Sequence, residues 1–422
     1  MLSEKLSGIH DKGERSKFIK EAAKGILPDA TDDELEAISA DCETFGVIDK
    51  YLSDINIEDI MINNTQNIFV YRAKTGSMKT PDVIKSKSEL DSLISKFKMY
   101  ATTSTANNQI FDVHLPNGSR VNIAESPMGA DITIRNFRQT ALSILDLVRT
   151  GELSYHMAAR FWLYVDGLKV RPANILIGGM PASGKTTILN AMFSFFRPES
   201  RVVTMEETYE LNTETQDNCV RLETNPNLSL EDLVKNSLRM RPDTIIIGEV
   251  RGEEAKDMMT AMNVGKIAIA TIHASTSRDV VTRLQHAPMN VDKDIIPLVD
   301  AIIIVSQIRE KNSYSRKVTQ VSEISGVENQ VLLSDLYTYD YKTHTGSDIL
   351  PSVTYRDILA RLSGYSPAEI IGEELRRAKI LEQLDKVGIR DLRGINEFSR
   401  DYYENPAAAL SRIGLSGLGT LQ

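Results

Sequence analysis

Residues 178–187 read GGMPASGKTT, and the rest of the chain is arranged around this stretch. Within it, residues 179–186 have the spacing G-x-x-x-x-G-K-T of the phosphate-binding loop called Walker A. The apolar run 174–177 predicts a buried parallel strand before the loop, and apolar residues at helical spacing over 188–196 predict a helix after it. Such a turn lets successive backbone N–H groups face a phosphate at the positive end of a helix. This context disfavours a chance glycine-rich turn.

Individual residues of the loop have separate predicted tasks. We expect the Lys185 ammonium group to reach the β- and γ-phosphates of ATP, and the Thr186 hydroxyl to ligate Mg²⁺. ATP and Mg²⁺ are therefore the predicted cofactors. The predicted nucleotide-binding residues are Gly179, Pro181, Ala182, Ser183, Gly184, Lys185, Thr186 and Thr187.

Composition and charge narrow the functional class. The chain has 422 residues, which favours two or three domains, and its hydrophobic share of 41% is ordinary for a globular protein. A net charge of −9 disfavours a general nucleic-acid-binding surface. Cys42 and Cys219 form no C-x-x-C motif, which is typical of reduced thiols in a cytoplasmic protein. No apolar run approaches the ~20 residues of a membrane span, and we see no signal peptide. Membrane association is therefore expected to go through a partner.

Composition and predicted secondary structure change along the chain and suggest domain boundaries. Residues 1–50 are predicted to be helical and acidic, which favours a solvated helical face, with a docking arm as the alternative. Residues 51–137 are predicted to form a small α+β domain, and residues 138–150 a linker. Residues 151–422 are predicted to form the ATPase domain, which ends in a helical subdomain over about 350–415.

Strands and helices are predicted to alternate in this larger domain, which implies a parallel sheet with helices on both faces. The predicted fold class is α/β: a small α+β N-terminal domain, then a RecA-like P-loop NTPase domain with a helical C-terminal region. A β-hairpin is predicted over 316–324 and 330–339. The predicted strands are 174–177, 201–205, 244–248, 266–272 and 301–305, and the predicted helices are 186–196, 229–240, 253–263 and 277–286.

Acidic residues are predicted at the same sheet edge as the loop. Glu249 ends the apolar strand 244–248, and in a P-loop sheet such an acid lies next to Mg²⁺ and the γ-phosphate. We expect Glu249 to hold a metal-bound water or to polarise the attacking water. The alternative is a surface acid at a strand end. Basic residues just before and after the strand, in 239–243 and at Arg251, disfavour that alternative.

A second acidic cluster and a histidine follow neighbouring strands. Glu206, Glu207 and Glu210 come after the strand 201–205, and they would repel one another unless a cation shares the site. Mg²⁺ bound to ATP is that cation, and a solvated acidic turn is the alternative. His273 ends the strand 266–272 and could sense the γ-phosphate, whereas a lone histidine is usually structural.

Taken together, the order of these motifs resembles the secretion ATPases of type II and type IV secretion systems, type IV pili and archaella. The resemblance covers about residues 50–415 and is strongest over 238–252. Four segments match the family motifs: a Walker A loop at 179–186, an Asp box at 205–211, a Walker B segment at 238–252 and a His box at 270–274. In the N-terminal domain, 115–120 and 132–137 also look like family elements. The C-terminal segments 388–391 and 401–406 are similar to archaeal members.

Three positions depart from the family pattern. Glu207 stands where the family usually has Asp, residues 264–266 read VGK where Gly-His is usual, and residues 116–118 read PNG rather than PDG. The first two bear on the tuning of hydrolysis and do not threaten nucleotide binding. The zinc-binding tetracysteine insert of many bacterial members is absent from the sequence, so no structural zinc is expected.

By resemblance, the chain is expected to be a cytoplasmic ATPase that works as a homohexamer. It would dock on the inner face of a polytopic membrane platform protein and drive assembly of a pilus- or archaellum-like filament, or secretion. The resemblance also implies that the N-terminal domain supplies arginines to nucleotide, with ordinary surface arginines as the alternative. Candidates are Arg120, Arg135 and Arg138; with them the predicted catalytic set is Glu249, Glu207, Glu206, His273, Arg120 and Arg135, and the predicted metal ligands are Thr186 and Glu249.

Two other functional classes stay open. A RecA-like nucleic-acid translocase would show DNA-stimulated ATPase activity and a basic groove, which the net charge of −9 disfavours. A scaffold that binds ATP without turnover is favoured only by the altered Asp box and by Lys266. Filament assembly, filament retraction and secretion are not distinguished by these residues.

Overall fold

The computed structural model describes Leu6, Ile9 and residues 11–104, 109–126, 129–136, 141–197, 199–225, 227–310 and 313–419. The chain divides into two compact units. Unit 1 consists of Met1–Gln139 with Arg309–Tyr314, and unit 2 of Thr140–Ile308 with Ser315–Gln422. Within the described ranges, every helix is too short or too polar to cross a membrane.

Unit 1 is built on an antiparallel sheet whose apolar face forms its core. A short turn joins the first two strands of this sheet, and a helix over Lys87–Lys98 is capped by Ser86. The strands run in the order β3 (Gly76–Lys79), β2 (Asn67–Arg72), β1 (Asp59–Asn64), β7 (Gly129–Arg135), β6 (Arg120–Ser126), β5 (Ile110–His114) and β4 (Ala101–Ser104), and the helices are α2 (Lys12–Ile26), α3 (Asp32–Cys42), α4 (Asp49–Leu52) and α5 (Lys87–Lys98), with the 3₁₀ turn η1 (Gly46–Ile48).

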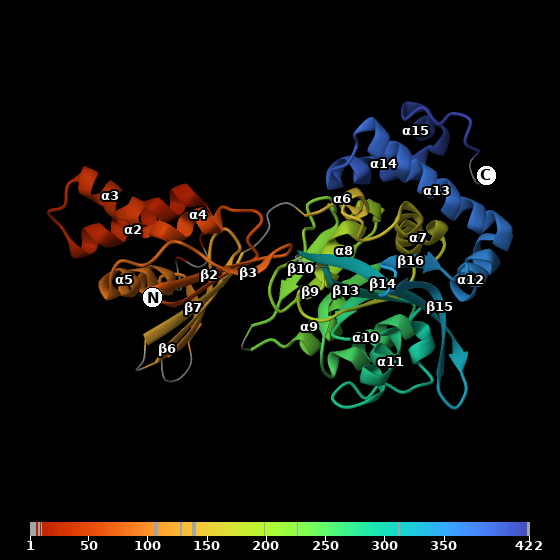
Figure 1. The fold of residues 1–422 in the computed structure, drawn as a ribbon, viewed down its shortest axis with the longest axis horizontal. Helices are drawn as coiled ribbons and strands as arrows, with labels where there is room; N and C mark the ends of the chain where they lie inside the picture. The colour runs from red at the N-terminus through yellow and green to blue at the C-terminus, as the bar shows by residue number, and fades with distance from the viewer. Residues whose placement is uncertain are drawn as a thin grey trace. The chain divides into compact units, whose positions relative to one another are not determined.

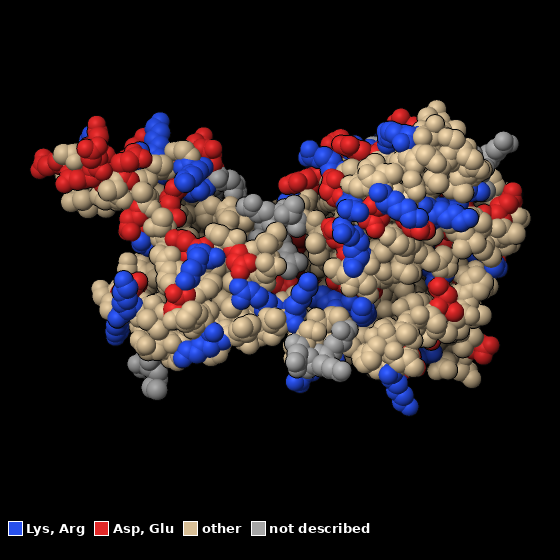
Figure 2. All heavy atoms as spheres, turned by 45° about the horizontal axis from the view of Figure 1, so that its top comes forward, with Lys and Arg blue, Asp and Glu red and all other residues tan. Residues whose placement is uncertain are grey.

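The N-terminal helices of unit 1 combine a buried contact with an acidic outer surface. Helices α2 and α3 pack against each other, and Ile19 and Leu35 are buried. Helix α3 begins with a capping box formed by Thr31 and Glu34. Figure 2 shows acidic side chains gathered over this end of the unit. These acidic side chains are exposed, which both interpretations of the segment, a solvated helical face and a docking arm, require.

Unit 2 is built on a mixed sheet whose central part is parallel. Its strands run in the order β10 (Cys219–Glu223), β9 (Val202–Glu206), β11 (Thr244–Val250), β12 (Ile267–Ile272), β8 (Ile175–Gly178), β13 (Ala301–Glu310), β14 (Ser313–Val327), β15 (Val331–Asp340) and β16 (Thr345–Asp348). The pairs from β10 to β13 are parallel, whereas β14–β15 and β15–β16 are antiparallel. The five predicted parallel strands and the hairpin are confirmed.

Helices cover both faces of this sheet (Figure 1). Two buried apolar clusters, one on each face, hold them in place. One face carries α9 (Leu230–Ser237), α10 (Glu254–Asn263) and α11 (Ser277–Gln285); the other carries α6 (Ile144–Arg149), α7 (Tyr155–Asp166), α8 (Lys185–Met192) and the C-terminal helices α12 (Thr354–Ser363), α13 (Pro367–Val387), α14 (Leu392–Glu404) and α15 (Pro406–Arg412). Short 3₁₀ turns are η2 (Gly167–Lys169), η3 (Phe193–Phe195) and η4 (Ile296–Leu298).

The C-terminal helices belong to the core of unit 2. Trp162 of α7 stacks on Phe195 and donates a hydrogen bond from Nε1 to the Tyr403 hydroxyl at 2.8 Å. The Arg377 guanidinium lies over the same indole ring and pairs with the buried Asp166 carboxylate at 2.8 Å. A charge buried this deeply costs free energy unless it is paired, so these contacts define one packing of the helices on α7.

The structure differs from the sequence-based expectation in two places near the sheet. Helix α6 lies inside 138–150, where the sequence predicts a linker, and its Ile144, Leu145 and Leu147 side chains are buried. Its capping box, Ser143 with Asp146, is a local signal for a helix start that the prediction of a linker overlooked. Strand β10 was also not predicted, because its half-buried residues form no continuous apolar run.

Candidate functional site

The loop 179–186 joins β8 to α8 in the shape that a phosphate requires. A Cβ atom at Gly179 would lie 2.2 Å from Ser183 Oγ and 2.6 Å from the Val305 carbonyl oxygen, so only glycine fits there. Gly184 has φ 103° and forms the N-cap of α8, and no described side chain caps that helix. The buried Ser183 hydroxyl also has no partner among the described residues. The loop therefore ends at the positive N-terminus of a helix that no described side chain caps, which is a favourable place for an anion.

Lys185 is folded back into its own loop. The side chain is buried, and Nζ donates hydrogen bonds to the carbonyl oxygens of Gly179 at 3.0 Å and Met180 at 3.3 Å. The same Nζ lies 3.3 Å from Nδ1 of His273. A buried ammonium group that donates to neutral acceptors favours the approach of an anion, which would replace these contacts with stronger charged ones.

His273 connects the lysine to the predicted catalytic acid. Its Nε2 lies 2.8 Å from Glu249 Oε1. Burial, together with the nearby charge of Lys185, lowers the pKa of His273, so the ring is neutral at pH 7. With the ring neutral, we assign the proton to Nε2, which donates to the Glu249 carboxylate; Nδ1 then accepts from Lys185 and also lies 3.3 Å from the Gly179 carbonyl oxygen. Lys185, His273 and Glu249 thus form a continuous chain.

Arg251 joins this chain to the second acidic cluster. Its Nε contacts Glu249 Oε1, and its Nη1 lies 3.1 Å from Glu207 Oε2. Glu249 is mostly shielded, whereas the side chains of Arg251 and Glu207 are more than half exposed, at 56% and 53%. The arginine therefore fixes the Glu249 carboxylate from one side while His273 holds it from the other. The sequence placed Arg251 beside the motif without giving it a task.

Glu206 and Glu210 have different surroundings from Glu207. Glu206 is buried, and its Oε1 accepts hydrogen bonds from the backbone N–H groups of Glu210 at 2.7 Å and Leu211 at 2.9 Å. Burial raises the pKa of Glu206 to about 7. Thr186 Oγ1 lies 3.3 Å from Glu210 Oε2. The acid next to the predicted metal ligand is therefore Glu210, which the sequence placed in the cluster but not in the catalytic set.

A further arginine reaches the loop from a distant strand. Arg316 lies on β14, is half-buried, and donates from Nε to the Ala182 carbonyl oxygen at 3.0 Å. Sequence reasoning missed it because it belongs to no motif and lies 134 residues away from Ala182. The predicted hairpin was the only sequence signal that this strand approaches the loop.

The predicted arginines of the N-terminal domain lie in unit 1. Arg120 begins β6 and Arg135 ends β7, and the two residues are direct partners in the antiparallel register. Arg138 lies outside the described residues. The structure therefore brings Arg120 and Arg135 to one end of the interior strand pair β6–β7 in unit 1, and gathers the loop, Glu249, Glu207, Glu206 and His273 in unit 2.

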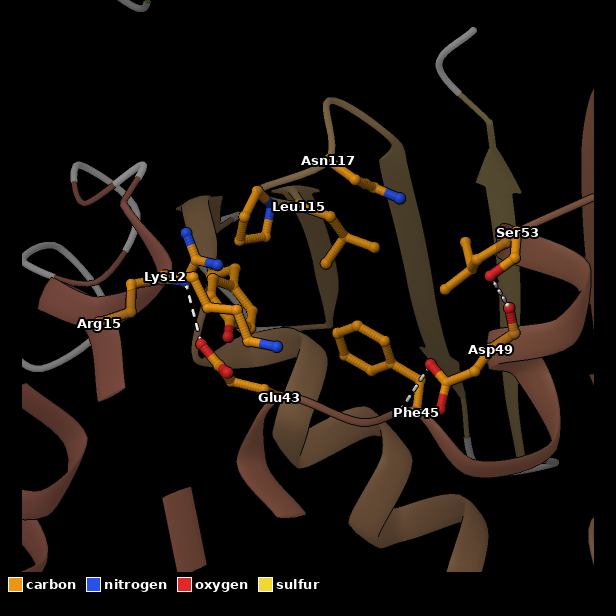
Figure 3. A pocket seen from close by; sticks show the side chains of 11 residues that line it. Lys12, Arg15, Glu43, Phe45, Asp49, Ser53, Leu115 and Asn117 are labelled. Atoms are coloured by element: carbon orange, nitrogen blue, oxygen red, sulfur yellow. Dashed lines mark hydrogen bonds and ion pairs between the residues drawn. The ribbon is translucent and has the colours of Figure 1, made fainter. Parts of the chain in front are cut away.

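A separate hollow of about 350 Å³ lies within unit 1. Figure 3 shows Lys12 and Arg15 of α2 on one side of it, with Glu43 close to the Arg15 guanidinium and the Asn117 turn across from them. Arg15 is already held by Glu43 and by the Ile9 carbonyl oxygen. None of the predicted site residues lines this hollow.

The loop residues fit ATP, and the acids fit a magnesium ion. Glycine is required at Gly179, and the Ser183 hydroxyl and one oxygen of Glu206 are buried without a partner in the described part of the chain. No group of three or more His, Cys, Asp or Glu side chains arranged to hold a metal occurs among the described residues. Mg²⁺ keeps several waters and is bound by substrate phosphates and one or two side chains, and the Thr186 hydroxyl, with Glu210 Oε2 3.3 Å away, offers oxygens of this kind.

Comparison with known proteins points to one family. The family described as type II/IV secretion system protein matches residues 42–335 of the chain. An uncharacterised protein of Methanocaldococcus jannaschii is 29% identical over 411 residues, which cover 93% of this chain and 72% of that protein. A probable conjugal transfer protein TrbB of Sinorhizobium fredii is 28% identical over 292 residues, covering 66% of this chain and 86% of that protein. The structure of the Legionella pneumophila ATPase DotB has a TM-score of 0.50 and 18% identity, covering 83% of this chain and 93% of that one; this likeness concerns the fold.

Proposed function

The chain belongs to the type II/IV secretion system protein family, and from this premise we propose that it is an ATPase that powers secretion or the assembly of a type IV pilus- or archaellum-like filament. The observation that carries the proposal is the chain of contacts Lys185–His273–Glu249. The loop follows β8, His273 follows β12, and Glu249 is the penultimate residue of β11; these three strands are neighbours in the sheet. Ligands bind outside the carboxyl ends of strands in such sheets.

Each residue at this edge has a task in ATP binding or hydrolysis. The N–H groups of the loop and Lys185 bind the phosphates, and Thr186 with Glu249 holds Mg²⁺, close to Glu210. Bound Mg²⁺ would offset the charge that develops on the transferred phosphoryl group. Glu249 accepts a hydrogen bond from the attacking water and orients it. His273, neutral and donating from Nε2, keeps the carboxylate in place until nucleotide draws Lys185 away from the ring.

Arginines of unit 1 are proposed to complete the site across a subunit boundary. Arg120 and Arg135 are direct cross-strand partners, and the side chains of such a pair lie on the same face of the sheet, so both could reach one anion. We propose that this anion is a nucleotide phosphate held by a neighbouring subunit. This proposal implies a homohexameric ring, which would work on a polytopic membrane platform protein from the inner face of the cytoplasmic membrane.

Replacement of Lys185 tests the ATPase proposal. We expect Lys185→Ala to abolish detectable phosphate release and to weaken ATP binding by at least ~100-fold, because the charge facing the phosphates is lost. Lys256→Ala is the matched control, since Lys256 is an exposed lysine of α10 and should leave both quantities unchanged. Equal ATP affinity in wild type and Lys185→Ala, measured by calorimetry, would rule out the proposed site.

The same measurements separate the two other functional classes. If single- or double-stranded DNA raised the rate of ATP hydrolysis by the wild-type protein severalfold, this would favour a nucleic-acid translocase. Tight ATP binding without turnover, with or without lipid vesicles, would favour a scaffold. We expect turnover that does not depend on DNA.

A further inference from the structure

Ala182 has an unusual backbone conformation within the phosphate-binding loop. Its φ is 61°, in the left-handed region, where a residue with a Cβ atom is disfavoured and glycine is not. The residue is exposed and its methyl group is not part of either buried apolar cluster of unit 2. Packing of its own side chain therefore does not explain why the loop turns this way; contacts of the backbone hold the conformation, and one of them is the hydrogen bond from the Ser183 N–H to the Met180 carbonyl oxygen at 3.2 Å.

Arg316 is the group that contacts this turn. Its Nε donates to the Ala182 carbonyl oxygen at 3.0 Å, and its Cδ lies 3.1 Å from the place that a Cβ atom at Gly184 would occupy. The arginine thus crosses the loop over both of its left-handed residues. It is carried by β14, whose neighbouring residue Lys317 reaches the Gly151 carbonyl oxygen instead.

We propose that Arg316 is a positioning residue that holds Ala182 in its left-handed conformation and so keeps the loop in the shape that binds phosphate. A hydrogen bond from a guanidinium group is stronger than one between neutral partners, so it can offset the conformational cost at Ala182. The left-handed turn directs the following N–H groups toward the ligand. Arg316 acts through the loop and does not need to touch the nucleotide. The inference rests on the proposed nucleotide-binding function.

A double-mutant cycle between the two residues tests this proposal. Arg316→Gln should raise the Kd for ADP by ~10-fold, the loss of one charged hydrogen bond. Glycine adopts the left-handed conformation without cost, so in the Ala182→Gly background the same Arg316→Gln change should raise the Kd less than ~3-fold. Lys317→Gln is the matched control and should leave the Kd for ADP unchanged, because it removes a neighbouring contact of β14 only.

The results that would overturn the role of Arg316 differ from the result that would overturn the proposed nucleotide-binding function. A Kd unaltered by Arg316→Gln overturns the proposal. An equal loss in the wild-type and Ala182→Gly backgrounds also overturns it, because Arg316 would then act on the nucleotide or through another contact. If Arg316→Gln does not fold, Arg316→Lys enters the same cycle with the same expected rescue, and absence of rescue again overturns the proposal. Failure of the proposed function would be visible earlier, as absence of ADP binding by the wild-type protein.

Discussion

Replacement of Glu249 by glutamine should separate ATP binding from hydrolysis. The carboxylate lies at the end of β11, where it accepts a hydrogen bond from His273 Nε2 at 2.8 Å and contacts the Arg251 guanidinium. Glutamine keeps nearly the same shape and an oxygen that can accept from His273, but it lacks the negative charge. Binding rests mainly on the N–H groups of the loop, Lys185 and Thr186, none of which changes, and the glutamine side chain keeps an oxygen that can still face Mg²⁺. The substitution should therefore affect the hydrolytic step.

Two estimates of the size of the effect agree. A unit charge at 4 Å contributes about 4 kcal/mol at an effective dielectric constant of 20. Removal of one preorganised polar group from an active site commonly lowers the rate by about 10²–10³, which corresponds to about 2.7–4 kcal/mol. We therefore expect kcat to fall at least ~100-fold while the Kd for ATP changes by no more than ~3-fold. The partner Arg251 is half-exposed, so the loss of this ion pair should lower the free energy of unfolding by no more than about 1 kcal/mol.

Steady-state phosphate release gives kcat, and calorimetry gives the Kd for ATP under the same conditions. Glu253→Gln is the matched control, because Glu253 is an exposed glutamate close in sequence and its loss should change neither quantity. Normal turnover by Glu249→Gln, together with an inactive Glu207→Gln variant, would refute the reasoning. The Asp box would then supply the principal catalytic carboxylate, through the side chain that Arg251 links to Glu249.

Three further predictions concern the ring, the loop and the C-terminal region. Mixing Arg135→Ala subunits with Lys185→Ala subunits should partly restore ATPase activity, and no recovery despite demonstrated mixing would exclude an arginine acting in trans. Gly179→Ala should weaken ATP binding at least ~10-fold in a titration, because its Cβ atom would meet a backbone carbonyl oxygen at 2.6 Å, whereas Gly25→Ala, with open space around it, should leave binding unchanged. Hydrogen bonds to two carboxylates raise the pKa of His156 to about 9. The contribution of His156 to the free energy of unfolding is therefore complete below about pH 6.5 and is lost as the pH rises through 9. Urea unfolding should show a loss of about 1–3 kcal/mol over that range, and a His156→Gln variant should lack this dependence.

Local sequence patterns were enough to predict the scaffold of the site. The five central strands of unit 2 are buried on both faces, so each appears in the sequence as a continuous apolar run, and Glu249 lies at the C-terminal end of β11, directly before its last residue, Val250. The loop spacing is equally local, because the motif is contiguous in the sequence, although the distant Val305 carbonyl oxygen also requires glycine at position 179. Motifs at the ends of parallel strands share one sheet edge, which is enough to place Glu249 and His273 together.

Other features depend on which distant segments meet, and local periodicity does not encode this. Arg316 reaches Ala182 because β14 extends the sheet beyond β13, and Glu210 approaches Thr186 because Glu206 folds the turn 207–211 around its buried carboxyl group. The sequence by itself thus determined the phosphate loop, the strand pattern and the edge where its acids lie. Only the tertiary structure decided which acid faces Thr186 and which arginine holds the loop, because side-chain direction and strand order, rather than spacing along the chain, bring those atoms within hydrogen-bond distance.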